Sequence, residues 1–217
     1  MPQRQTYDPG TPSWVDYVAP DLDAGAQFYC DLFDWTVTAE ESAETTRGYR
    51  KFLRGGRYVA GLGLGRPPMW TTYVSVADAD VVAKTVEAHG GAVLSEPQDV
   101  ADLGRRALFA DPEGARFAVS QPGERNGAEL VNEPGSFCWS ELACRDVEAA
   151  KTFYGAVFGW DGTTTSIAND TSTYTEFRLA DSGGDGESAT PDRGVGRDER
   201  GVACRDTCAL DGVFRYR

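Results

Sequence analysis

The chain has 217 residues, of which 41% are hydrophobic, so it can bury one large core or two small ones. Its formal net charge of -13 argues against nucleic acid and anionic membranes as partners, because phosphate groups would repel such a surface. The beginning of the chain lacks the apolar region of a signal peptide, and no later run of about 18 apolar residues could cross a bilayer. We therefore predict a cytoplasmic protein whose partner is a small molecule or another protein.

The residues that most often bind soft metals are few in this chain. It has five cysteines and a single histidine, His89, which falls at the predicted end of a helix. Cys204 and Cys208 lie close in sequence, but without a further Cys or His nearby they cannot complete a tetrahedral site. We predict free thiols and a solvated imidazole.

An offset of 125 residues brings two parts of the chain into register, which indicates an internal repeat. The offset superposes Trp14 on Trp139 and Asp16 on Glu141. The further matches are Asp21 with Asp146, Phe28 with Phe153, Tyr29 with Tyr154, Phe33 with Phe158, Trp35 with Trp160, Tyr49 with Tyr174, and Phe52 with Phe177. Such a number of aromatic matches at one offset is improbable by chance.

Each copy begins with a predicted strand, 13–19 or 138–144, followed by an aspartate that can cap a helix. Apolar residues at three- and four-residue steps make the helix after the first strand amphipathic. The first copy continues with strands predicted over 49–54, 57–64 and 70–76, then a helix over 79–89 that a glycine pair ends. A further strand over 92–100 and a hairpin with its turn at 111–114 complete it.

These motifs resemble the vicinal oxygen chelate superfamily, which includes glyoxalase I, bleomycin-binding proteins and extradiol dioxygenases. The resemblance rests on DLDAGAQFYCDLFDW, VSVADADVVAKTVEAHGGAV and GRRALFADPEGARFAV, and the first motif recurs as DVEAAKTFYGAVFGW. It implies an α+β fold of paired βαβββ modules whose curved mixed sheet forms a cup. We expect a complete module over 10–122, a linker over 123–134 and a partial second module over 135–181.

Enzymes of that superfamily hold a divalent metal in the cup with His, Gln or Glu side chains, and this sequence departs from the pattern. The position of the first ligand aligns with Trp14, whose indole cannot bind a metal. The other ligand positions align with about Thr71 and with Ala118. The resemblance therefore implies the fold, whereas these departures argue against the usual metal site. We predict no cofactor, and a divalent metal could bind only through other ligands.

Two pairs of residues, each an aromatic residue with an acidic one, remain as candidates for ligand binding. Alternation along a strand puts Trp14 and Asp16 on one face, and the repeat puts Trp139 and Glu141 in equivalent places. Aromatic walls with carboxylates suit a flat or cationic small molecule. Further candidates for this wall are Trp70 and Tyr73, and of the adjacent Arg105 and Arg106 at most one can face inward to an anionic ligand. We predict a metal-free, resistance-type small-molecule-binding protein; the structural alternative is that these residues are core and satisfied surface groups.

Two other functions remain open. Asp16 and Glu141 could act as general acid and base, or as unusual metal ligands, in a lyase, dioxygenase or hydroxylase of the same superfamily. Alternatively, the fold could serve as a regulatory module that binds a protein.

Residues 182–217 lack the apolar periodicity that a continuing second module requires. They are rich in Gly, Asp and Arg, which predicts disorder, and a frameshifted reading of a GC-rich gene would produce this composition. An incomplete second module would expose a sheet edge and an apolar face. We therefore expect a homodimer, exchange of elements between chains, or aggregation.

Overall fold

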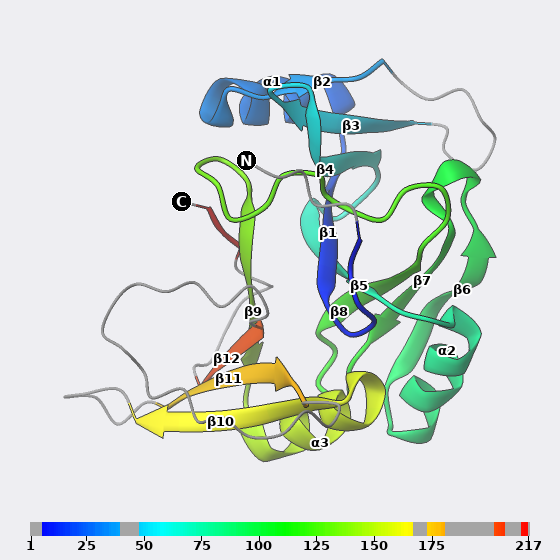
Figure 1. Ribbon diagram of the computed structural model, residues 1–217, viewed down its shortest axis with the longest axis vertical. Coiled ribbons are helices and arrows are strands. Elements are labelled where there is room, and N and C mark those ends of the chain that lie inside the picture. The colour runs from blue at the N-terminus through cyan, green and yellow to red at the C-terminus, as the bar shows by residue number, and fades with distance from the viewer. Residues whose placement is uncertain (1–5, 40–47, 167–172, 181–201, 207–213, 217) are drawn as a thin grey trace.

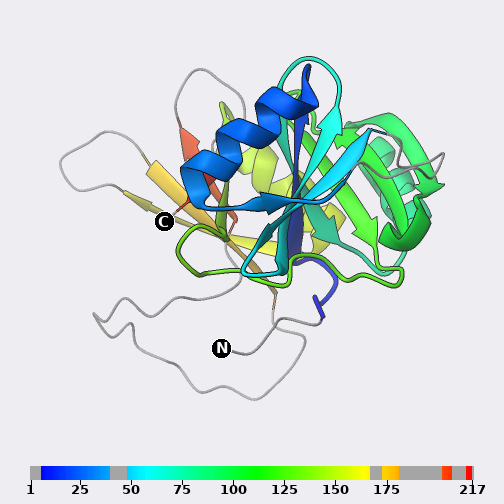
Figure 2. The same cartoon turned by 90° about the horizontal axis from the view of Figure 1, so that it is seen from above.

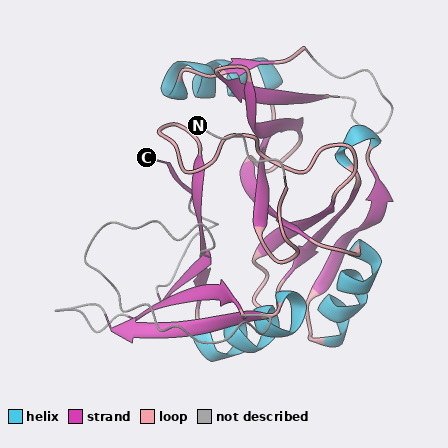
Figure 3. Cartoon of the chain, viewed as in Figure 1, coloured by secondary structure: helices cyan, strands magenta, loops and turns pink. Residues whose placement is uncertain are grey.

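The computed structural model describes residues 6–39, 48–166, 173–180, 202–206 and 214–216, which form two sheets and three α-helices (Figures 1 and 3). The elements of the first sheet and its helices are β1 (Pro12–Ala19), α1 (Leu22–Phe33), β2 (Thr36–Val37), β3 (Tyr49–Arg54), β4 (Arg57–Leu64), β5 (Met69–Ser75), α2 (Ala79–Ala88), β6 (Ala92–Asp99), the short 3-10 helix η2 (Ala101–Leu103), β7 (Arg105–Ala110) and β8 (Arg116–Gln121). The second sheet and its helix comprise β9 (Phe137–Cys144), α3 (Val147–Phe158), β10 (Trp160–Ser166), β11 (Thr173–Leu179), β12 (Val202–Asp206) and β13 (Phe214–Tyr216).

An aspartate begins each of the three α-helices. The carboxylates of Asp21, Asp78 and Asp146 accept hydrogen bonds from backbone N–H groups of the first turn of α1, α2 and α3. Those N–H groups have no partner within the helix, so the carboxylate satisfies them and also interacts favourably with the helix dipole. At the other end α3 stops at Gly159, which takes a left-handed conformation. These local signals place the helices where the sequence predicts them.

The first sheet has eight strands in the order β2-β3-β4-β1-β5-β8-β7-β6. β1 runs parallel to β4 and antiparallel to β5, and β5 runs parallel to β8. The sheet thus consists of two βαβββ units joined along β1 and β5. A shift of 57 residues relates the units, since it takes Asp21 to Asp78 and Tyr49 to Arg106. The predicted α+β fold with a large curved mixed sheet is confirmed.

The second sheet has the order β10-β11-β12-β9-β13 and lies to one side of the first (Figure 2). β9 pairs in parallel with β12 and antiparallel with β13, the same pattern that β1 forms with β4 and β5. Two strands therefore fall within 182–217, for which the sequence predicts disorder. The remainder of that segment, 181–201, 207–213 and 217, lies outside the described residues.

Two apolar clusters hold the helices against the sheets. One lies between α1 and the first sheet and includes Val15, Phe52 and Leu62, which are fully buried. The other packs α2 and α3 together with β8, and here Phe117 contacts Phe153 with ring centroids 6.0 Å apart. Because the helices cover one face of the first sheet, its other face is left for a site.

Reciprocal hydrogen bonds join the two parts of the molecule. The indole of Trp35 donates to the carbonyl of Gly135 at 2.7 Å, and the indole of Trp160 donates to the carbonyl of Gly10 at 2.8 Å. Both donors and both acceptors are 125 residues apart, so each part of the chain contributes the same contact to the other. Of the cysteines, Cys30 is a free thiol as expected, whereas Cys144 is disulfide-bonded, contrary to the prediction.

Candidate functional site

Alternation along β1 brings Trp14 and Asp16 to the face of the first sheet that the helices do not cover. Val15 between them belongs to the core beneath α1. On the neighbouring strand β5, Tyr73 pairs with Trp14 and Thr71 pairs with Asp16. Trp14 and Asp16 are buried, with 3% and 6% exposure. The predicted shared face of these two residues is therefore observed, and Tyr73 joins them.

Hydrogen bonds link these residues into a group that we call the Asp16 network: Trp14, Asp16, Tyr49, Tyr73 and Arg106. One carboxylate oxygen of Asp16 accepts from the Trp14 indole at 2.5 Å and from the Tyr49 hydroxyl at 2.6 Å. The other oxygen lies 3.4 Å from the Arg106 guanidinium, which also stacks over the Tyr73 ring at 4.5 Å. The buried charge of Asp16 is thus surrounded by donors, as a buried carboxylate requires.

The two tyrosines of the network stay protonated. Burial raises the pKa of Tyr49 and of Tyr73 well above the usual value, and the Asp16 charge raises both further. Each hydroxyl is therefore a hydrogen-bond donor at any physiological pH.

A glycine makes room for this network. Gly61 on β4 pairs with Asp16, and a Cβ atom added there would lie 2.0 Å from an Asp16 carboxylate oxygen and 2.0 Å from the Tyr49 hydroxyl. No side chain fits at such distances, so the network depends on Gly61. A shift of 57 residues takes Gly61 to Ala118, the equivalent place on β8 and one of the positions that aligns with a metal ligand of the superfamily.

Two cavities lie beside the network. The larger, about 330 Å³, is lined by Trp14, Lys51, Tyr58, Leu103, Arg106, Glu124, Arg125, Asn126, Gly127 and Glu129. The smaller, about 250 Å³, includes Asp16, Tyr49, Tyr73 and Leu108. Leu103 and Arg106 line both cavities, so these two residues lie between them. The larger volume is near the lower end of the range for small-molecule sites, about 300–1,000 Å³, and the smaller volume lies below that range.

The other predicted site residues do not join the network. Trp70 lies three residues before Tyr73, so it points to the opposite face, where its indole donates to the Tyr29 hydroxyl at 2.9 Å. Its ring packs against Tyr17 beneath α1, so Trp70 belongs to the core rather than to the aromatic wall.

Trp139 and Glu141 form an equivalent group in the second sheet. The Trp139 indole donates to the Tyr174 hydroxyl at 3.2 Å, and Tyr174 donates to the Glu141 carboxylate at 3.1 Å. Ser140 lies between them in the strand and contacts Thr72 of the first sheet. Because side chains alternate along a strand, Trp139 and Glu141 point away from the first sheet. Asp16 and Glu141 therefore belong to separate groups of hydrogen-bonded residues. The structure does not bring the two carboxylates together into one acid–base or metal site.

Several residues of the site were not among the predicted ones. Lys51 and Arg125 both lie against the carboxylate of Asp102, and Arg125 stacks over the Tyr58 ring at 4.4 Å. Tyr49 had a signal in the sequence, because the offset of 125 matches it to Tyr174. Lys51, Asp102 and Arg125 had no such signal, since only the tertiary fold brings them to the cup.

The residues at the superfamily's metal positions do not fit a divalent ion. Trp14 presents an N–H donor, Ala118 has no donor atom, and Thr71 contributes at most a neutral hydroxyl. In the part of the chain that the structure describes, no three His, Cys, Asp or Glu side chains are grouped so as to hold a metal. His89 lies at the end of α2, where its ring bonds the Thr85 carbonyl.

The class of protein follows from this fold and from a family comparison. Residues 11–119 match the model of the Glyoxalase/Bleomycin resistance protein/Dioxygenase superfamily, and the chain belongs to that family. The chain also superposes on solved structures of the fold. A Mn(II)-bound glyoxalase from Novosphingobium aromaticivorans gives a TM-score of 0.61 at 19% identity, over 90% of this chain and 61% of that one. The 2,3-dioxygenase LapB from Pseudomonas sp. KL28 gives a TM-score of 0.61 at 11% identity, over 94% of this chain and 72% of LapB.

Among named relatives, the anthracycline biosynthesis protein DauV of Streptomyces sp. strain C5 is 40% identical over 171 residues, which are 70% of this chain and 62% of DauV. CFP32 of Mycobacterium bovis, named as a candidate glyoxylase, is 36% identical over 175 residues, 77% of this chain and 67% of CFP32. The chain thus spans less than two thirds of the length of DauV. Among the helices that the structure describes, none has the length and apolar character needed to cross a membrane.

Proposed function

We propose that this protein binds an organic small molecule in the cup of the first sheet and does so without a metal. The observation that carries the proposal is the Asp16 network. It places an indole, two phenols and an ion pair at the floor of the cup, where the metal ligands of the superfamily would lie, and cavities open beside it. A resistance-type protein that sequesters its ligand needs no more than such a site.

The relatives support an organic ligand without naming it. DauV is named for anthracycline biosynthesis, and the Mn(II)-bound glyoxalase shares the fold at an identity that supports no further transfer. Trp14 and Tyr58 give the larger cavity aromatic surfaces on which a flat ligand can stack.

Metal analysis of the purified chain tests the absence of a metal. We expect far less than one divalent ion per chain, and the same melting temperature with and without a chelator. A stoichiometric metal whose removal lowers the melting temperature would instead support the metal-dependent lyase, dioxygenase or hydroxylase.

A thermal-shift screen of small aromatic compounds tests binding. We expect ligands that raise the melting temperature of the chain, because a ligand that binds only the folded state stabilises it by mass action. The same ligands should have no effect when Gly61→Val disrupts the floor of the cup in a chain that still folds. A screen without ligands, together with a protein partner that binds the purified chain, would favour the regulatory module.

A further inference from the structure

Arg106 is the charged side chain that contacts both cavities. Its side chain is 11% exposed, its ion pair with Asp16 is long at 3.4 Å, and its Nε atom is buried without a hydrogen-bond partner. Removing guanidinium donors from water is unfavourable unless acceptors replace the water. The surroundings of Arg106 therefore supply fewer acceptors than the group can use.

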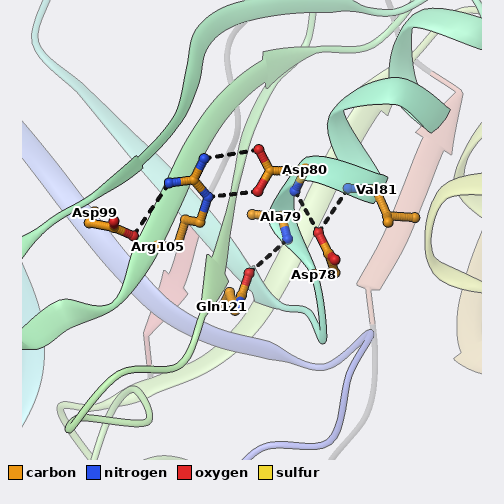
Figure 4. Close-up of polar contacts among 7 residues, drawn as sticks. All are labelled: Asp78, Ala79, Asp80, Val81, Asp99, Arg105 and Gln121. Carbon is orange, nitrogen blue, oxygen red and sulfur yellow. Dashed lines mark hydrogen bonds and ion pairs between the residues drawn. The ribbon is translucent and has the colours of Figure 1, made fainter.

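The adjacent Arg105 shows what a fully paired arginine looks like in the same strand. It points to the other face, where its guanidinium forms two parallel hydrogen bonds to Asp80 at 2.7 and 2.9 Å and a third, at 3.4 Å, to Asp99 (Figure 4). Side-chain alternation along β7 thus gives one arginine to the surface and one to the cup. The two residues form a natural pair of test and control.

Three cations, Lys51, Arg106 and Arg125, and two carboxylates, Glu124 and Glu129, line the larger cavity. Lys51 is buried at 4% exposure and shares the Asp102 carboxylate with Arg125. Glu129, which also lines the cavity, accepts from the backbone N–H of Tyr58 at 2.9 Å. Two cations thus share one carboxylate at a site that also contains Arg106.

The carboxylate that the sequence suggested for binding a cation is already engaged. Asp16 accepts from Trp14 and Tyr49 on one oxygen and faces Arg106 with the other. A cationic ligand would have to displace these donors from a buried position. Asp16 is therefore better suited to positioning Arg106 than to contacting a ligand.

We propose that Arg106 anchors the anionic oxygen of a planar aromatic ligand in the larger cavity, with Trp14 and Tyr58 as the aromatic walls. This inference rests on the proposed function, since it names the class of ligand for the same cup. A planar guanidinium recognises an anionic oxygen through charge-assisted hydrogen bonds, and the aromatic walls favour a flat ring. The net charge of -13 repels anions at a distance, so selection must come from contact inside the cavity.

The test compares 2-naphthoate with the neutral, nearly isosteric 2-naphthamide by isothermal titration calorimetry on the full chain. We expect naphthoate to bind at least about ten-fold more tightly, the effect of one charge-assisted hydrogen bond. Arg106→Gln should reduce the ratio of the two affinities to about one, whereas Arg105→Gln should leave the ratio unchanged. Because Arg106→Gln leaves Asp16 without its cation, the double variant Asp16→Asn/Arg106→Gln provides a second test in which no unpaired charge is buried.

Three results would overturn the inference: equal affinities for the acid and the amide, a ratio that survives in the double variant, or no binding of naphthoate. Equal affinities would still leave the proposed function standing, because a neutral aromatic molecule would then occupy the cup. The failure of every compound in the wider screen would count against the proposed function itself. The two proposals can therefore fail separately.

Discussion

Asp16 and Arg106 stabilise each other at the floor of the cup, although 90 residues separate them in sequence. Both side chains are buried, with 8% and 11% exposure. Replacing one member of a buried pair leaves the other charge without its partner, which costs more than the pair itself contributes. The network is therefore sensitive to single substitutions at either residue.

We expect Asp16→Asn to lower the free energy of unfolding by about 3 kcal/mol or more, because Arg106 would remain buried without its carboxylate. Urea denaturation measures the change. Asp23→Asn is the control, since the side chain of Asp23 is 88% exposed and pairs with Arg50 on the surface. A loss no larger than that of the control would show that the Asp16 network contributes little to stability.

Asp102 gives the site a dependence on pH. Burial raises the pKa of its carboxyl, but the hydrogen bond from Arg125 and the charge of Lys51 outweigh burial and hold the pKa below its usual range. A depressed pKa means that the ion pairs stabilise the fold above the unfolded-state pKa of about 3.9 and that this stability is lost as the pH falls.

We therefore expect Asp102→Asn to lower the free energy of unfolding at neutral pH by about 1–3 kcal/mol, because the buried Lys51 would lose a charge-assisted partner. The deficit should disappear as the pH falls below about 4, since the wild-type carboxyl is then protonated as well. Denaturation of both proteins across this pH range measures it. A deficit that is the same at all values of pH would mean that the charge of Asp102 is not its cause.

At the scale of elements, α1 and α3 carry matching apolar residues in different surroundings. Phe153 of α3 is 2% exposed because α2 and β8 cover it, whereas Phe28, at the equivalent place of α1, is 59% exposed. Leu32 of α1 is likewise 57% exposed. Figure 1 shows α1 and α3 at opposite ends of the long axis of the molecule. The predicted homodimer or aggregation would use such a face and stays a prediction.

We expect Phe153→Ala to cost about 3–5 kcal/mol of stability, because it opens a cavity in the core between α2 and α3. Phe28→Ala should cost less than about 1 kcal/mol, since its ring is largely in solvent. Thermal and urea unfolding of the two variants measure the difference. Equal losses would indicate that the face of α1 is covered in solution, and sedimentation velocity would then show whether a second copy covers it.

At the scale of the whole molecule, two indole donors join the parts of the chain. Trp35 and Trp160 are 4% and 8% exposed, and each donates to a carbonyl that lies 100 or 150 residues away. The acceptors Gly10 and Gly135 both have positive φ, 85° and 71°, a conformation that glycine adopts without strain. The same hydrogen bond, from a tryptophan indole to a glycine carbonyl, thus occurs twice in the molecule.

We expect Trp160→Phe and Trp35→Phe each to lower the free energy of unfolding by about 1–3 kcal/mol, since each leaves a buried carbonyl without its donor. Hydrogen exchange should increase first in β9 and α3 for Trp160→Phe, because that bond ties them to the start of the chain. An effect confined to one of the two variants would show that the contacts are equivalent in geometry but not in energy.

The sequence by itself determined the parts of the fold that depend on local chemistry. Aspartate caps fix where the three helices begin, and two-residue periodicity fixes that Trp14 and Asp16 share a face while Val15 enters the core. The same periodicity excluded Trp70 from the face of Tyr73, although both had been predicted to line the cup. The aromatic matches at an offset of 125 include Tyr49, Trp35 and Trp160, but they predicted no contact for any of the three.

Only the tertiary structure decided what Asp16 contacts and therefore what the cup can bind. Adjacent arginines look alike in sequence, and the direction in which β7 presents Arg106 depends on its register with β8. Lys51, Asp102 and Arg125 come from a strand, a 3-10 turn and a loop, and no spacing rule connects them. Because electrostatic interactions depend on distance and burial rather than on order in the chain, the sequence predicted an acidic cup, whereas the fold pairs its central carboxylate with an arginine.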